Sequence, residues 1–348
     1  MTLHGRHAAA ATEPGAARAA SDALADGGTA LDAVLAGWAS AAGSHPGVLL
    51  GGWQALFAGP GVGARAIDGR SRQPGLGVKR PRGFALSGEV PASARASVPS
   101  SLAAMALALA TDCQLPLRRL LRPGIEAAEA VGASRRAAVL DRIASLGAGA
   151  LHDAHLARPF VAAAGPAVGG LVTAEDLVAV RPAIADARTV GVGARRLLAL
   201  PWETTAASSP APRLVTAGDH RGVVAVLAYA CDDTGVALTD TELTAPCDAV
   251  PVWRGVPRSR PGTPIATTAP LWVALDQALA VLACGVEVAQ PPSLDEVGTG
   301  WREAATAVEL VEALARAASG ATAVGVVRVE TPGGVRLRSV LVKSPVLG

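Results

Sequence analysis

The apolar part of this sequence consists mostly of alanine rather than of large side chains. Half of the 348 residues are hydrophobic, yet aromatic residues account for only 3%. Small side chains bury little area each, so they form a core only where helices and strands pack at close range. The chain is long enough to bury such a core as one large domain or two small ones. We therefore expect closely packed elements throughout.

The balance of charge and the hydropathy exclude several kinds of partner. There are 31 basic and 29 acidic residues, a net charge of +2, which creates no long-range field for nucleic acid or an anionic membrane. The longest apolar runs, 102–110 and 223–231, are about half as long as a membrane span. Residues 1–15 lack the charged start and apolar block of a secretory signal. We expect a cytoplasmic protein without nucleic-acid or membrane partners.

Neither the cysteines nor the histidines have a spacing that indicates a metal site. His152 and His155 lie three residues apart, but no cysteine or carboxylate cluster accompanies them, so solvated or core histidines are favoured. The cysteines contain no CxxC pair and are expected to be small buried residues in a reducing compartment; they are Cys113, Cys231, Cys247 and Cys284. The sequence predicts no metal and no cofactor.

The first half of the chain has mainly helical patterns. Residues 16–42 form two alanine-rich helical stretches broken at Gly27-Gly28, between cap residues Asp26 and Thr29. Thr173 and Asp176 have the spacing of a capping box. Three helices are expected in 100–146, with Pro116 and Pro123 interpreted as helix starts. A glycine-broken strand is expected at 46–57 and a further helix at 153–164.

The second half is richer in β-branched residues. Residues 223–231 and 236–243 are interpreted as a hairpin that turns at Asp232–Gly235, and 322–329 with 335–342 as another. Residues 271–284 and 302–318 have the length and composition of helices. A loop rich in proline, serine and threonine, 201–212, separates the two halves. Together these elements favour an α+β layered sandwich.

Several segments, in order, resemble the signature motifs of the γ-glutamyltransferases. Ala10–Ala36 resembles the ATxHP start and GGNAxDAAVA helix of that family, and Gly169–Pro182 resembles its GGLxTxEDLAxYRP motif almost residue for residue. Between them, a glycine-rich strand, DxRExAP, VPG and LPWxxLLxPAIxLAExG motifs have counterparts at 46–57, 68–74, 98–99 and 115–132. After residue 200 the resemblance is weaker, and the chain is shorter than members of that family.

This resemblance implies an α+β fold with the four-layer αββα sandwich of the N-terminal-nucleophile hydrolases. It also implies a single domain, 1–348. Within it, residues 1–200 correspond to the large subunit, 201–215 to a shortened seam, and 216–348 to the small subunit.

The resemblance also implies a threonine nucleophile at the start of a strand that leads into a DxxG turn. If the turn is Cys231–Gly235, counting back reaches Ala225, which has no hydroxyl. If the turn is Asp219–Gly222, counting back reaches Pro212, which has none either. A displaced hydroxyl is the alternative, although loop hydroxyls more often serve turns and solvation; the candidates are Thr204, Thr205, Ser208, Ser209 and Thr216.

Other site groups follow from the same resemblance. Arg70 stands where the family's arginine binds the substrate α-carboxylate, which suits a planar bidentate donor. Thr267 and Thr268 replace a serine pair, and Asp248 is a candidate partner for the substrate amine. Pro270 is expected to run directly into a helix, without the Gly-Gly oxyanion loop. The sequence contains no asparagine, so the family's asparagine positions are unfilled.

Two functional hypotheses remain open at this point. The first is a catalytically degenerate γ-glutamyltransferase-like protein that binds a γ-glutamyl or amino-acid-like molecule, or stabilises a second copy or an active homologue. The second is an active amide hydrolase or acyltransferase that uses a displaced threonine or serine.

Overall fold

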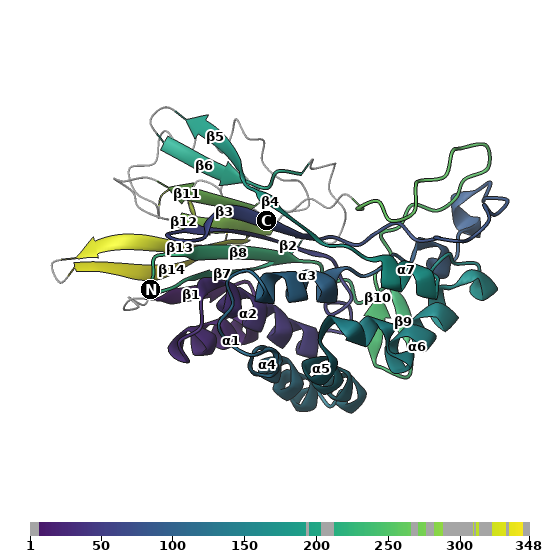
Figure 1. The fold of residues 1–348 in the computed structure, drawn as a ribbon, viewed down its shortest axis with the longest axis horizontal. Coiled ribbons are helices and arrows are strands. Elements are labelled where there is room, and N and C mark those ends of the chain that lie inside the picture. Colours follow the sequence, from purple (N-terminus) through teal and green to yellow (C-terminus); the bar gives the residue numbers. More distant parts are fainter. Residues whose placement is uncertain are drawn as a thin grey trace.

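The computed structural model describes residues 7–192, 195–202, 212–265, 271–275, 282–287, 309, 311–312, 322–331 and 334–343. Two antiparallel sheets lie face to face, and helices cover the outer face of the first sheet (Figure 1). Among the helices that the described residues form, none has both the length and the apolar character needed to cross a bilayer.

The first helical pair follows the local signals in the sequence. Helix α1 (Pro14–Ala25) and helix α2 (Ala30–Ser44) are separated by a break in which Gly27 has a φ of +87°. Thr29 caps α2, since its hydroxyl accepts from the Asp32 N–H while Asp32 accepts from the Thr29 N–H. Nearly all of α2 is buried. Its many small residues let neighbouring elements pack closely against every face of the helix.

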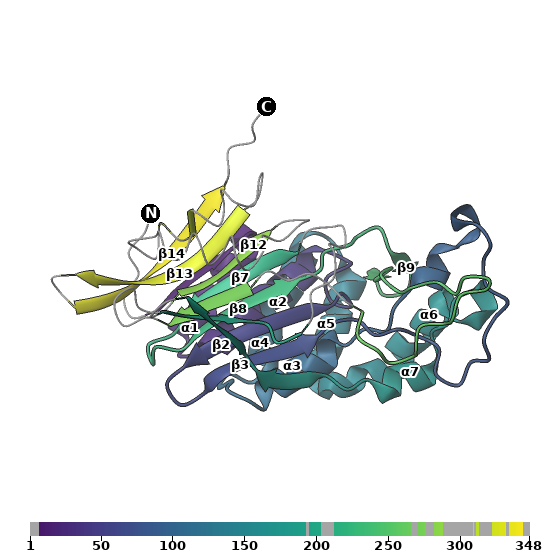
Figure 2. The same cartoon turned by 90° about the horizontal axis from the view of Figure 1, so that it is seen from above.

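Further helices complete the layer beneath the first sheet and extend beyond it. They are α3 (Ser101–Leu109), α4 (Leu117–Ala130), α5 (Ser134–Leu146), α6 (Ala154–Ala164) and α7 (Ala174–Ala179), with short 3-10 turns at Ser87–Glu89, Ala92–Arg95, Gly147–His152 and Pro166–Val168. Viewed from above, α6 and α7 lie beyond one end of the sheets, beside β9 (Figure 2). The predicted capping box of Thr173 and Asp176 is confirmed at α7.

Pro123 does not begin a helix as predicted. It lies inside α4, where it removes one backbone hydrogen bond. The next residue, Gly124, packs directly against α2, so tertiary packing compensates for the local cost.

The first sheet combines strands from both halves of the chain. Its order is β1-β7-β8-β2-β3-β4, all antiparallel. The strands are β1 (Ala8–Ala11), β7 (Arg213–Gly218), β8 (Val224–Tyr229), β2 (Trp53–Gly59), β3 (Gly63–Gly69) and β4 (Ala183–Asp186). Strands β7 and β8, from the second half of the chain, thus lie between β1 and β2, from the first half.

The second sheet covers the other face of the first. Its order is β14-β13-β12-β11-β6-β5, and Leu56, Val226 and Val273 are among the buried residues between the two sheets. The strands are β14 (Gly334–Lys343), β13 (Thr322–Thr331), β12 (Leu282–Glu287), β11 (Leu271–Leu275), β6 (Arg195–Ala199) and β5 (Arg188–Val192). The predicted C-terminal hairpin is confirmed by the β13–β14 pairing.

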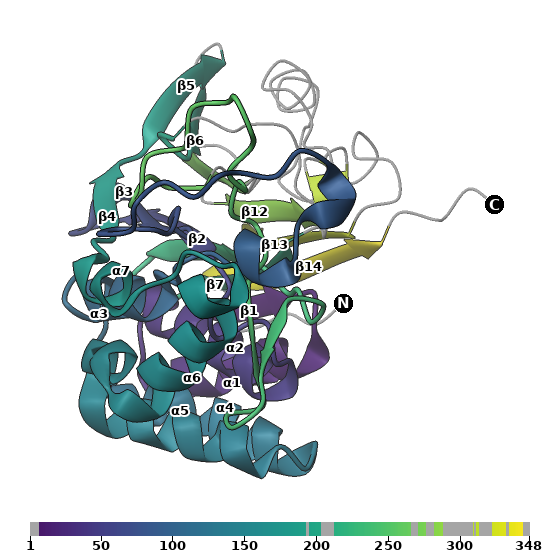
Figure 3. The same ribbon diagram turned by 90° about the vertical axis from the view of Figure 1, so that its right-hand side faces the viewer.

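Seen end on, the helices lie below the first sheet and the second sheet above it (Figure 3). These are three of the four expected layers. The helix expected at 302–318 falls largely outside the described residues, although Glu309, Val311 and Glu312 are helical.

Three sequence predictions in these regions were wrong. Residues 223–231 and 236–243 do not form a hairpin, because β8 pairs with β7 and β2 on its two edges, and β9 (Val236–Leu238) pairs with β10 (Leu243–Ala245) in a small separate sheet. The predicted helix 271–284 is replaced by β11 and the beginning of β12, and Leu271 and Val273 of β11 face the core. The strand expected at 46–57 begins only at Trp53, after a turn.

Candidate functional site

One end of the first sheet carries Arg70, and Asp248 lies beside the loop that follows it. The strand register aligns four residues in a row across β7, β8, β2 and β3, namely Arg213, Tyr229, Trp53 and Gly69. Beyond this row the chain continues to Pro212, Cys231, Gly52 and Arg70. We call this end, from Pro212 to Arg70, the site edge.

Arg70 is held at the site edge by a buried carboxylate. Asp68 accepts from Arg70 Nε at 2.8 Å, from one terminal nitrogen at 3.0 Å, and from the Arg70 backbone N–H at 3.0 Å. This bidentate pair fixes the plane of the guanidinium. Asp68 binds Nε and Nη2, so the second terminal nitrogen, Nη1, lies outside the pair. The guanidinium carbon also lies 5.7 Å from the centre of the Trp202 ring.

Two arginines share that single carboxylate, so the group formed by Asp68, Arg70 and Arg72 is cationic. Arg72 donates to the second oxygen of Asp68 at 3.4 Å, and its Nε is buried without a hydrogen bond. Burial lowers the pKa of Arg72, an effect that Asp68 opposes and Arg70 reinforces. A cavity of about 230 Å³ adjoins this arginine, between it and Arg181. Two guanidinium groups against one carboxylate favour binding of an anion.

Arg70 is also positioned by the backbone, because its loop packs closely against the backbone at Gly52. A Cβ on Gly52 would lie 3.0 Å from the Ser71 nitrogen and 3.2 Å from the Arg70 Cα. The missing side chain in the glycine-rich segment therefore allows the Arg70 loop to pack on β2, as the sequence pattern predicted.

The threonine pair expected to contact substrate lies outside the described residues. The chain that leads toward Thr267 and Thr268 nevertheless runs beside the Arg70 loop: Ile265 N–H donates to the Ser71 carbonyl at 2.8 Å, and Gln73 N–H donates to the Thr263 carbonyl at 2.9 Å. The role of both threonines stays a prediction.

Asp248 is fixed beside the same loop. The Gln73 side chain donates to the Val250 carbonyl at 2.8 Å and accepts from the Val250 N–H at 3.1 Å, so it holds the 248–250 segment in place. Burial raises the pKa of the Asp248 carboxyl, against the opposing effect of the Ser97 and Ser71 hydroxyls beside it. Because Ser71 follows Arg70, the fold brings an arginine and a carboxylate of opposite charge to one region.

The hydroxyl candidates for nucleophile are placed unequally. Thr216 lies in the middle of β7, is fully buried, and donates to the Ala10 carbonyl at 3.5 Å. Its hydroxyl therefore has no access to a ligand in this conformation. The other candidates lie outside the described residues; these are Thr204, Thr205, Ser208 and Ser209.

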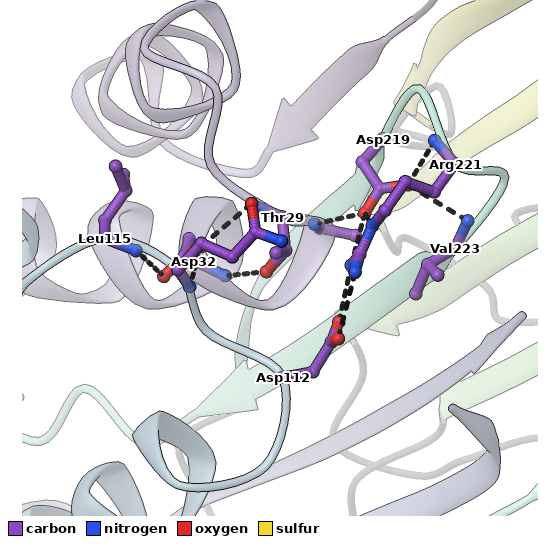
Figure 4. A network of polar contacts seen from close by, with 9 residues as sticks. Thr29, Asp32, Asp112, Leu115, Asp219, Arg221 and Val223 are labelled. Atoms are coloured by element: carbon purple, nitrogen blue, oxygen red, sulfur yellow. Dashed lines mark hydrogen bonds and ion pairs between the residues drawn. The ribbon is translucent and has the colours of Figure 1, made fainter. Parts of the chain in front are cut away.

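Of the two possible DxxG turns, only Asp219–Gly222 closes a hairpin. It joins β7 to β8, and Gly222 has a φ of +83°. The buried Asp219 carboxylate accepts from the backbone N–H groups of Arg221 and Val223, at 2.9 and 3.1 Å, and from the Ala30 N–H at the start of α2. Arg221 in turn forms an ion pair with Asp112 (Figure 4). Counting back from this turn reaches Pro212, the residue before β7.

One further group lies at the site edge, and no motif in the sequence predicted it. Glu13, His45 and Cys231 come together there from three distant positions, with Asp233 beside them. The Cys231 sulfur and the Glu13 carboxylate raise the pKa of His45 to about 10. Only the tertiary fold creates this cluster, so no spacing rule could have found it.

The two stacked antiparallel sheets, the helical layer and the order of the strands define an α+β fold of the N-terminal-nucleophile hydrolase type, as the sequence predicted. No protein-family model and no curated protein sequence matches the chain. Solved structures match it over almost its whole length. Cephalosporin acylase from Bacillus halodurans has a TM-score of 0.72 at 14% identity and covers 99% of this chain and 97% of its own.

Two other solved structures extend the comparison. The protein described as LmbA2991T421A has a TM-score of 0.72 at 13% identity, with 99% of each chain covered. A γ-glutamyltranspeptidase from Pseudomonas nitroreducens, complexed with L-DON, has a TM-score of 0.48 at 21% identity over 57% of this chain and 72% of its own. The full-length matches establish the fold of the chain, and its activity is a separate question.

Proposed function

We propose that this protein binds the amino-acid end of a γ-glutamyl or similar small molecule at the site edge, without the threonine chemistry of the γ-glutamyltransferases. The observation that carries this proposal is the β7–β8 hairpin. Counting back from its DxxG turn with the spacing of the γ-glutamyltransferases reaches Pro212, whose ring offers neither a hydroxyl nor a primary amine. Removing that hydroxyl removes the covalent step on which the family depends.

Binding is supported by what surrounds that position. A ligand carboxylate would pair with the terminal nitrogen of Arg70 that Asp68 leaves outside its bidentate contact. A ligand ammonium would pair with Asp248, whose buried carboxyl gains a cationic partner on binding. An α-amino acid carries both charges on one carbon, so it matches a site with one group of each sign.

A protein of this kind would act by binding or by stabilising a partner, with a second copy of the chain or an active homologue as the macromolecular partner. We keep this role and a cytoplasmic location as parts of the proposal.

A second function is favoured by one observation. The segment 203–211 begins after Trp202, which lies against Arg70, and ends at Pro212, so both of its ends lie at the site edge. A hydroxyl from Thr204, Thr205, Ser208 or Ser209 would then attack the amide of a γ-glutamyl compound, form an acyl-enzyme, and release it to water or an amine. Self-cleavage within this segment would accompany such an activity in this class of protein.

The mass of the purified and denatured chain distinguishes the two functions. We expect one species of 34.6 kDa, because Pro212 cannot lead self-cleavage. Two fragments whose masses sum to the whole would overturn the proposal, and the first residue of the smaller fragment would identify the nucleophile. Thr204→Ala and Ser208→Ala variants would then test that residue directly.

Ligand binding is tested by titration calorimetry with L-glutamine and with glutathione. We expect Arg70→Gln to weaken binding by about 10–150-fold, the equivalent of roughly 1.5–3 kcal/mol for a hydrogen bond to a charged group. Asp248→Asn should weaken it comparably. Arg65→Gln, which removes an exposed arginine from the same strand region, is the matched control and should have no effect. Failure of the wild-type chain to bind either compound, or an equal loss in the control, would contradict the proposal.

A further inference from the structure

The cluster at the site edge consists of three side chains with different donor atoms. Glu13 is the residue before α1, His45 is the residue after α2, and Cys231 follows the end of β8. One carboxylate oxygen, one imidazole nitrogen and the thiol sulfur all lie within 4.8 Å of one another. All three residues are partly buried, so the donor atoms converge in a sheltered position that still opens to solvent.

The imidazole ring of His45 is oriented by carboxylates on both sides. Its Nε2 lies 3.4 Å from Glu13 Oε2, inside the cluster. Its Nδ1 lies 3.4 Å from Asp233 Oδ2, and the other oxygen of Asp233 accepts from the Gly47 N–H at 3.0 Å. A histidine that binds a metal through one nitrogen commonly donates its other N–H to such a carboxylate, which fixes the tautomer.

The backbone around this cluster is closely packed. A Cβ on Gly47 would lie 2.0 Å from the Asp232 carbonyl oxygen, so only glycine lets the segment after His45 lie against the segment after Cys231. This contact fixes the distance between the two residues, although they are far apart in the sequence.

Two further polar atoms lie buried beside the cluster. One is Glu13 Oε1, and the other is the hydroxyl of Tyr229, a residue that is only 1% exposed. Burial raises the pKa of Tyr229, and the charges of Glu13 and Cys231 and a side-chain hydrogen bond with Glu13 add to that effect, whereas Arg213 opposes it. Glu13 Oε1 also faces Arg213, whose Nε lies 3.9 Å away. The geometry of the three converging donor atoms therefore indicates the site by itself.

We propose that Glu13, His45 and Cys231 bind a divalent transition-metal ion, of which zinc fits the donor set best. Sulfur and imidazole nitrogen exclude magnesium and calcium, which require oxygen ligands. In a tetrahedral site, metal–ligand bonds of about 2.0–2.3 Å separate the ligand atoms by about 3.5 Å. Side-chain rotations that move the donor atoms by about 1 Å would therefore bring all three within bonding distance of one ion. A thiolate and a carboxylate neutralise the charge of the ion, and a fourth position stays open to water or a ligand.

Zinc content and affinity test this proposal without any assay of activity. Protein freed of metal with a chelator should take up one zinc per chain, measured by mass spectrometry of the metal and by competition with a chromophoric chelator. Cobalt in place of zinc should give a thiolate-to-metal charge-transfer band. Cys231→Ser should abolish that band, and Asp233→Asn should lower zinc affinity by about 10–100-fold, as expected for a residue that orients a ligand.

Matched variants keep the test specific. Cys247→Ser removes another partly buried thiol, and His155→Gln removes an exposed histidine, so both should leave the affinity and the cobalt band unchanged. Far-UV circular dichroism confirms that each variant is folded. A wild-type chain that binds no stoichiometric zinc, or zinc binding that survives Cys231→Ser and disappears in His155→Gln, would overturn the proposal. Acylation of Cys231 by an activated γ-glutamyl amide in a chain that binds no zinc would do the same and identify a cysteine nucleophile instead.

Discussion

Replacing Asp219 by alanine is expected to destabilise the protein by about 3–5 kcal/mol, the range for removing one partner from a buried charged network. The Asp219 carboxylate is fully buried and accepts from three backbone N–H groups and from the Arg221 guanidinium at 3.0 Å. Alanine would leave the Ala30, Arg221 and Val223 N–H groups without their acceptor, and it would remove an anion from the N-terminus of α2.

Urea denaturation of the wild-type and variant proteins measures this effect. Asp141→Ala is the matched control, because Asp141 pairs with Arg118 at the surface, and its loss should change stability by less than about 1 kcal/mol. Asp219→Asn, which retains one acceptor oxygen, should fall between the two. An Asp219→Ala protein as stable as the Asp141→Ala protein would show that the hairpin turn holds its place without this carboxylate.

Replacing Gly43 by alanine is expected to cost about 3 kcal/mol or more, at the upper end of the range for overpacking. Gly43 in α2 faces Gly124 in α4, and an added Cβ would lie 1.9 Å from the Gly124 carbonyl oxygen. The clash is with backbone, which cannot rotate away as a side chain can. The two helices would have to separate, and the small-residue packing between them would be lost along their length.

Thermal unfolding of Gly43→Ala tests this prediction. Gly88→Ala is the control, since an added Cβ at Gly88 meets nothing within 4 Å. Alanine is the better helix former by about 0.8–1.0 kcal/mol, so helix propensity alone would stabilise Gly43→Ala. A loss of stability therefore reports the close approach of the helices, and an unchanged or higher melting temperature would contradict it.

The elements that the sequence predicted correctly depend on signals between neighbouring residues. The Gly27-Gly28 break and the cap at Thr29 lie within a few positions of each other, and so do Thr173 and Asp176. The resemblance to the γ-glutamyltransferases also placed the chain in the correct fold type, which no single local pattern could have done.

The elements that the sequence predicted wrongly depend on which strands become neighbours. Two DxxG turns stand within a short distance of each other, and only the pairing of β8 with β7 selects Asp219–Gly222 over Asp232–Gly235. The alanine- and leucine-rich residues that begin at Leu271 suit a helix. They form β11 instead, because Leu271–Leu275 pairs with β6 and β12 in the second sheet and buries Leu271 and Val273 against the first.

The candidate site divides in the same way. Arg70 could be predicted as a site residue because its motif is contiguous, whereas the place of Asp248 depends on Gln73, far away in sequence. The cluster of Glu13, His45 and Cys231 combines residues from the ends of three elements. These residues are far apart in the sequence, so their spacing could not predict the cluster.

The position of β7 and β8 between β1 and β2 has a consequence for any break in the chain between Trp202 and Pro212. Both strands of the hairpin would remain hydrogen-bonded to strands of the other polypeptide, so the products would form an obligate heterodimer with interleaved strands. Gel filtration would not distinguish it from the intact chain. Neither polypeptide could complete the central sheet alone, and each would expose unpaired strand edges that promote aggregation.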